Sequence, residues 1–126
     1  VFVEKALKNE DIVLLGEGKR VQNYIDVFDI ARAIECVIEA DNPNGIYNIA
    51  SPNAVSNIEL AELCKSILKS DSKILFNGKD KEEDNKWIVD TSKAEKELGF
   101  IAKKSIEESI FEIKEEIMKS ENTFSK

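Results

Sequence analysis

Strand-like and helix-like hydrophobic patterns alternate along this chain, and the alternation restricts the folds open to it. Short apolar or alternating runs at residues 12–15, 22–27, 46–50 and 73–76 predict strands. Between these runs, apolar residues recur at spacings of three and four, which is the period of one buried helix face. Strands that alternate with helices are typical of α/β proteins, so we expect an α/β fold.

Capping residues indicate where the predicted helices begin and end. Asp29 precedes an apolar stripe and is expected to cap a helix there. A serine followed three residues later by a glutamate forms a capping box, and this pair occurs at Ser56–Glu59 and at Ser105–Glu108. Gly99 is expected to end a short helix that begins after residue 90, because glycine tolerates a left-handed backbone. The stripe behind Ser105 comprises Ile106, Ile110, Ile113 and Ile117.

The segment Gly16-Glu17-Gly18 lies between two predicted strands and has some likeness to a nucleotide-binding loop. A dinucleotide loop needs a third glycine three residues after the second, and a helix that starts within the motif. Here the third position is Val21, and residues 22–27 alternate as a strand does. The two glycines are therefore expected to bend the chain between strands and not to hold a pyrophosphate.

Length and charge exclude several classes of protein. A chain of 126 residues corresponds to one domain. Its 25 acidic and 18 basic residues give a net charge of −7, which argues against a surface for nucleic acid or for anionic membranes. No apolar run approaches the roughly 20 residues that span a bilayer, and no signal-peptide pattern opens the chain. Nucleic acid and membrane are therefore not expected partners.

The sequence has no self-evident catalytic or metal-binding constellation. It contains no histidine, the usual general base and metal ligand. Cys36 and Cys64 fall at apolar positions of predicted helices, which indicates buried, reduced thiols and a cytoplasmic location. Because the chain starts at Val1 and not at methionine, we expect it to be part of a longer protein.

Three segments carry a more specific signal: GEGKRVQNYIDVFDIARAI at 16–34, GIYNIASPNAVSNIELAEL at 45–63, and WIVDTSKAEKELGF at 87–100. In the same order they resemble three blocks of the extended short-chain dehydrogenases/reductases. These blocks are a Gly-x-Gly segment leading to Arg-Asp, a Tyr-Asn-Ile-Gly strand, and a closing Asp-x-Ser-Lys-Ala block. Over residues 1–117 the chain resembles the carboxy-terminal part of the NAD-dependent nucleotide-sugar epimerase/dehydratase family, of which UDP-glucose 4-epimerase is an example.

The resemblance implies the substrate-binding portion of an extended Rossmann-type fold, without the cofactor-binding half. On this basis residues 1–119 form the substrate-binding region and residues 120–126 a polar tail. The family's cofactor loop and its Tyr-x-x-x-Lys pair are absent, since Phe28 and Ser51 stand four residues after Tyr24 and Tyr47. We therefore expect NAD or NADP to bind the full-length parent, no cofactor to bind this chain, and the chain alone to be inactive.

The resemblance also implies a site for a UDP- or TDP-linked sugar. Val13 and Leu15 would lie against the uracil or thymine ring, and Asn53 would reach the base from the loop after the third strand. The alternative is structural: Val13 and Leu15 as strand core, and Asn53 as an ordinary loop residue. Tyr47, Ser92 and Lys93 are expected to be structural, although each has a side chain capable of chemistry.

The expected phosphate contacts depart from the family pattern. Gln22 stands where the family has a diphosphate-binding arginine, and an amide brings no charge and no bidentate fork. Arg20 lies two residues earlier on the same strand face and could compensate. In the loop before the closing block, only Lys79, Lys81 or Lys86 could take the place of a second arginine. The alternative for Gln22 is an exposed strand residue without a ligand.

A second functional hypothesis is a non-catalytic binding or assembly module that keeps the epimerase-like fold. The two departures at the arginine positions favour it. In the family, the strand at 46–50 lies in the sheet of the amino-terminal Rossmann half, so that half is an expected partner. Without it, an apolar strand and the helix beside it are left uncovered, and we expect self-association into a dimer or higher oligomer.

Overall fold

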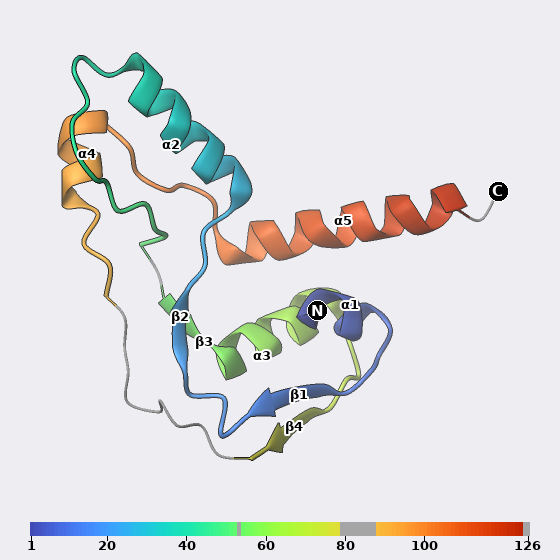
Figure 1. The fold of residues 1–126 in the computed structure, drawn as a ribbon. Helices are drawn as coiled ribbons and strands as arrows, with labels where there is room; N and C mark the ends of the chain where they lie inside the picture. Colours follow the sequence, from blue (N-terminus) through green and yellow to red (C-terminus); the bar gives the residue numbers. More distant parts are fainter. Residues whose placement is uncertain (53, 79–87, 125–126) are drawn as a thin grey trace.

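The computed structural model describes residues 1–52, 54–78 and 88–124, with side chains described as far as Ser120 (Figure 1). Helices and strands alternate, which confirms the predicted α/β class. In chain order the elements are α1 (Phe2–Leu7), β1 (Ile12–Leu15), β2 (Val21–Asn23), α2 (Val27–Glu39), β3 (Ala54–Ser56), α3 (Asn57–Leu68), β4 (Ile74–Asn77), α4 (Ser92–Leu98) and α5 (Ile106–Phe124).

β1 and β4 form a two-stranded parallel sheet, with Ile12 opposite Ile74 and Leu15 opposite Asn77. Side chains alternate between the two faces of a strand, and Ile12 and Leu14 are buried on the inner face of this sheet. Helices α1, α3 and α5 contribute to the core under that face. The buried residues of this core are Val3, Ala6, Ile12, Leu14, Ala61, Cys64 and Ile110.

A second, smaller core lies around α2 and α4, away from the β1–β4 sheet (Figure 1). Its buried residues are Ala33, Ala94, Leu98, Phe100 and Ala102. Three of these five residues are alanines, so the centre of this core holds little large apolar volume. Several large apolar side chains of α2 stay on the surface instead, among them Ile34 at 57% exposure and Ile38 at 77%.

The start of α2 corrects a sequence-based prediction. Asp26, and not Asp29, is the N-cap: its backbone is extended and its carboxylate accepts a hydrogen bond from Phe28 N at 2.8 Å. The strand predicted at 22–27 is consequently shorter, because β2 ends at Asn23. Asp29 is a buried carboxylate that forms an ion pair with Arg32 and accepts hydrogen bonds from the backbone of residues 103 and 104.

The segment at residues 46–50, predicted as a strand, belongs to neither sheet. A strand is defined by the neighbour that its backbone pairs with, and the four strands of the described chain pair with one another as β1–β4 and β2–β3. Within the described residues, the backbone N–H groups of 46–50 make no hydrogen bond to another backbone group. The prediction of a buried strand at 46–50 was therefore wrong for this chain.

The predicted helix ends agree with the structure at most positions. The capping boxes at Ser56–Glu59 and Ser105–Glu108 both form. Gly99 ends α4 with a φ of 64°, in the left-handed region expected for it. The last helix, α5, continues to Phe124, into the segment predicted as a polar tail.

Candidate functional site

The Gly16–Gly18 turn is a structural bend, as the sequence predicted. Both glycines have a positive φ, and a Cβ on Gly18 would lie 2.8 Å from Leu14 Cδ1 and 3.2 Å from Ile58 Cβ. The carbonyl of Gly18 accepts a hydrogen bond from Ile58 N at 3.0 Å, and the carbonyl of Arg20 accepts one from Asn57 N at 3.1 Å. These two carbonyls accept hydrogen bonds from the first N–H groups of α3, so those N–H groups are not available to a phosphate. The described residues at this turn therefore do not form a dinucleotide loop.

The strand that leads into this turn, β1, exposes apolar side chains to solvent on the outer face of the β1–β4 sheet. Val13, Leu15 and the neighbouring Leu75 are 48%, 58% and 42% exposed. Val13 is paired with Leu75 in the parallel register, so their side chains share a face. The strand-core alternative for Val13 and Leu15 is therefore wrong, and their apolar side chains are accessible to a ligand on this side of the sheet.

A polar cluster lies in and beside β2, immediately after the turn. The Tyr24 hydroxyl is 3.1 Å from Gln22 Oε1 and 3.2 Å from Asn57 Oδ1, the latter at the start of α3. Partial burial raises the pKa of Tyr24 above its ordinary value, and the positive charge of Arg20 opposes that rise. Gln22 in β2 and the residues that flank this strand, Arg20 and Tyr24, thus lie close together, and Asn57 joins them from the start of α3.

A second hydrogen-bonded link holds the chain that follows the 46–50 segment. Asn23 Nδ2 donates to the carbonyl of Ser51 at 2.8 Å, and Ser51 N donates to Asn23 Oδ1 at 2.9 Å. These two bonds attach the loop after residue 50 to the end of β2. Among the predicted site residues, Asn53, Lys79, Lys81 and Lys86 lie outside the described residues.

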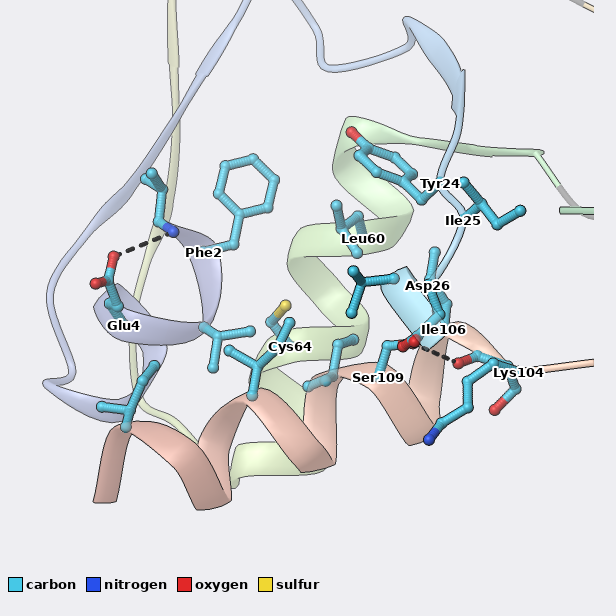
Figure 2. A pocket seen from close by; sticks show the side chains of 17 residues that line it. Phe2, Glu4, Tyr24, Ile25, Asp26, Leu60, Cys64, Lys104, Ile106 and Ser109 are labelled. Carbon is cyan, nitrogen blue, oxygen red and sulfur yellow. Dashed lines mark hydrogen bonds and ion pairs between the residues drawn. The ribbon is translucent and has the colours of Figure 1, made fainter. Parts of the chain in front are cut away.

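A cavity lies between α1, α3, α5 and the segment that joins β2 to α2, and Tyr24 of the polar cluster is among the residues that line it (Figure 2). It has a volume of about 700 Å³, and none of the predicted site residues lines it. The isoleucine stripe of α5 forms much of its wall, together with Leu60 and Cys64. Burial raises the pKa of the Cys64 thiol to about 11, so this cysteine is protonated at neutral pH and unsuited to nucleophilic attack.

Polar groups gather at one end of this cavity and satisfy one another (Figure 2). The Ser109 hydroxyl donates to Asp26 Oδ2 at 2.5 Å, and Lys104 forms an ion pair with Glu112. Burial raises the pKa of Asp26, but the hydrogen bonds from Ser109 and from Phe28 N and the charge of Lys104 outweigh it, so the pKa lies below its ordinary value. An ionised, hydrogen-bonded Asp26 joins α2 to α5 and is unsuited to act as a general acid.

A metal site and a membrane-spanning helix are both absent from the described residues. Among the residues that the structure describes, no group of three or more histidine, cysteine, aspartate or glutamate side chains is arranged to hold a metal ion. Nor does any helix within 1–52, 54–78 and 88–124 combine the length and the apolar character needed to cross a membrane. The candidate site is therefore the apolar sheet face with the polar cluster beyond the turn.

The model of the NAD dependent epimerase/dehydratase family matches residues 1–50. UDP-glucuronic acid decarboxylase 1 of Arabidopsis thaliana is 26% identical over 109 residues, which are 86% of this chain and 25% of the relative. A solved UDP-glucose 4-epimerase with UDP-glucose, from Thermotoga maritima, is 29% identical with a TM-score of 0.84, and covers 94% of this chain and 38% of its own. The Bordetella bronchiseptica enzyme WbmF, solved with NAD+ and UDP, is 26% identical with a TM-score of 0.73, over 97% of this chain and 39% of its own.

These findings confirm the resemblance that the three sequence blocks indicate. The α/β structure matches Rossmann-type epimerases and dehydratases over only part of their length. The chain spans a quarter of the decarboxylase and less than two fifths of either solved enzyme. The polar link between Tyr24 and Asn57 was not foreseen from the sequence, because the two residues come from different elements.

Proposed function

We propose that this chain, which resembles the NAD-dependent epimerase/dehydratase family in sequence and fold, binds the nucleotide part of a UDP- or TDP-linked sugar. On this proposal the chain is the carboxy-terminal, substrate-binding portion of the enzyme. The supporting observation is the open apolar face of β1 and β4, which lies next to the turn leading to Arg20 and Gln22. An apolar surface suits a base ring, and the donors beyond the turn suit a diphosphate.

We propose further that the hydride chemistry uses NAD or NADP held by an amino-terminal Rossmann half. The 126 residues contain neither a Tyr-x-x-x-Lys pair nor a glycine-rich cofactor loop. The Gly16–Gly18 turn is hydrogen-bonded to the start of α3 and not to a ligand-binding helix end that is free to hold a pyrophosphate. The complete protein would epimerise, dehydrate, oxidise or reduce its sugar, and this chain alone would do none of these. The free thiols of Cys36 and Cys64 accord with a cytoplasmic location.

Calorimetry with the chain as it stands tests this proposal. We expect UDP and UDP-glucose to bind weakly and NAD+ not to bind. Arg20→Ala should weaken UDP binding more than Gln22→Ala does, and high salt should remove most of the Arg20 effect, because the charge is then screened. Lys19→Ala is the matched control, since Lys19 is exposed and paired with Glu17. Micromolar NAD+ binding, or UDP binding that is indifferent to both variants, would contradict the proposal.

An assembly role is the second candidate, and the exposed face of α2 favours it. Ile30, Ile34, Val37 and Ile38 line an apolar groove together with Tyr47 and Ile49. Beside the groove, the backbone of 46–50 has no ladder partner in the described chain. Open strand edges and bare apolar surface both promote pairing with another chain, so we propose that this chain self-associates through this surface when the Rossmann half is not present.

Light scattering at micromolar concentration tests the assembly role. The expected result is a dimer or larger species that Ile49→Lys or Ile34→Lys disperses. Ala31→Lys, at an exposed position of α2 outside the groove, is the matched control and should leave the assembly intact. Circular dichroism must show retained secondary structure in each variant. A stable, well-folded monomer of the unaltered chain would rule the assembly role out.

A further inference from the structure

The Tyr24 hydroxyl joins two side-chain amides that are distant in sequence. It lies 3.1 Å from Gln22 Oε1 and 3.2 Å from Asn57 Oδ1. Gln22 comes from β2 and Asn57 is the first residue of α3. A hydroxyl has one proton to donate, and the two amide oxygens share it. Both oxygens are thereby turned toward Tyr24.

This arrangement fixes where the amide nitrogens point. In a carboxamide the oxygen and the NH₂ group lie on opposite branches, so an oxygen turned toward the hydroxyl directs the NH₂ away from it. Within the described residues, neither Gln22 Nε2 nor Asn57 Nδ2 has a hydrogen-bond partner on the protein. Each NH₂ group offers two donors, and both side chains are partly exposed. The cluster therefore presents neutral donors to an acceptor-rich group outside the chain.

The electrostatic surroundings suit an anionic acceptor. Arg20 is close enough for its charge to act on Tyr24. The amino-terminal end of α3, where Asn57 lies, carries the positive end of the helix dipole. The nearest backbone N–H groups are already used by carbonyls of the turn, which leaves the side-chain amides as the donors at this end of the helix.

We infer that Tyr24 is a positioning residue that holds the amides of Gln22 and Asn57 as a neutral donor pair for the phosphoryl oxygens of the ligand. The inference rests on the nucleotide-binding function proposed above, and adds Asn57 to the binding residues. It also explains how the site can hold a diphosphate although Gln22 carries no charge. The amides of Gln22 and Asn57, held in place by Tyr24, supply hydrogen bonds, and Arg20 supplies the positive charge. Neutral donors do not release counterions, so the contribution of the pair should be insensitive to salt, unlike that of Arg20.

Binding of UDP and of uridine to Tyr24→Phe tests the inference. The variant should bind UDP roughly two- to tenfold more weakly, since an orientating hydrogen bond is lost, while the weak affinity for uridine should be unchanged. In a Gln22→Ala, Asn57→Ala background, Tyr24→Phe should have no further effect on UDP, because Tyr24 acts only through the two amides. Tyr47→Phe is the matched control: its hydroxyl contacts Glu97 and the backbone of Asn44, away from the cluster.

Two outcomes of the UDP measurement separate this inference from the proposed function. If the unaltered chain binds UDP and Tyr24→Phe binds it equally well, the inference fails and the proposed function stands. If the unaltered chain does not bind UDP, the proposed function fails, and the inference fails with it.

Discussion

Two regions of this molecule both contain apolar strand-like and helical segments, but they differ in how far these segments are paired and buried. We call the first region the paired unit. It consists of α1, β1, α3, β4 and α5, which surround one core, and its two strands pair with each other. In the second, here the open unit, α2 and α4 pack through small residues, and the 46–50 segment has no strand beside it. The isoleucine that begins β1, Ile12, is fully buried, whereas Ile46 is 87% exposed.

The difference shows that an apolar run specifies a strand only when a partner edge is within reach. β1 is apolar at 12–15 and finds β4 across α3, so its backbone is satisfied and one face is covered. The run at 46–50, which is less apolar because it contains Asn48, finds no edge among the described residues. Because its backbone and the α2 face are both left open within the described chain, the open unit carries the surface that we propose for self-association.

Hydrogen exchange should give the largest contrast between the units. The amide of Ile12 donates to the carbonyl of Lys73 at 2.8 Å in a buried strand, so it should exchange only on global unfolding. The amide of Ile49 has no backbone acceptor in the described chain and should exchange at least about 100-fold faster. Exchange monitored by NMR at low protein concentration measures both. Equal protection would mean that 46–50 is paired, and protection that rises with concentration would locate self-association at this segment.

A buried and an exposed leucine in the same strand sharpen the description of the paired unit. Leu14 is 2% exposed and Leu15 is 58% exposed. Leu14→Ala should lower the free energy of unfolding by about 2–5 kcal/mol, because it leaves a cavity in the core, and Leu15→Ala by less than about 0.5 kcal/mol. Urea unfolding measures both. A comparable loss for the two variants would mean that the outer face of β1 is covered in solution.

The buried carboxylate of Asp29 is expected to be the strongest polar anchor of the open unit. It is 3% exposed, pairs with Arg32, and accepts backbone hydrogen bonds from residues 103 and 104 at 3.0 and 2.9 Å. Asp29→Ala should cost about 3 kcal/mol, because two N–H groups and a guanidinium lose their acceptor. Glu35→Ala, at an exposed position of the same helix, is the control for urea unfolding. If the two variants lose the same stability, α2 does not depend on this anchor.

Acid should produce the smallest effect, at the contact between the units. Asp26 caps α2 and accepts a hydrogen bond from Ser109 of α5, and its pKa lies below the ordinary value. A lowered pKa in the folded state adds stability above the unfolded pKa of about 4, and this stability is lost as the pH falls through the folded pKa. Ser109→Ala should raise the Asp26 pKa and reduce the acid-dependent part of the unfolding free energy by about 1 kcal/mol or less. Carboxyl NMR titration checks the pKa; an unchanged value would show that Ser109 does not stabilise the ionised form.

Much of the local structure could be predicted from single residues. Glycine at positions 16, 18 and 99 and the two serine–glutamate boxes determine bends and helix ends through contacts within a few residues, so their outcomes did not depend on distant parts of the chain. Asp26 and Asp29 were harder to distinguish. Both precede the same apolar stripe, and only the burial of Asp29 against the 103–104 backbone assigns them different roles.

Some features of the candidate site could likewise be predicted from the sequence, and others could not. The sequence placed Val13 and Leu15 on one strand face and Arg20 and Gln22 on another, because the period of two is a local property. It could not show that Asn57 reaches the Tyr24 hydroxyl, because β2 and α3 are brought together by the pairing of β2 with β3. The three blocks of similar sequence indicated the resemblance to a family, and the contact that we infer to orient the phosphate donors came from the fold.

By itself, then, the sequence determined the alternation of helical and strand patterns, the two glycine bends and most of the helix caps, all of which depend on residues a few positions apart. Only the tertiary structure decided which face of β1 is buried, which aspartate caps α2, and that 46–50 lies open beside it. Burial and strand pairing depend on which surfaces meet, and a surface is covered only if a partner of the right shape lies within reach. β1 has such a partner in β4, and within the described chain the segment at 46–50 has none.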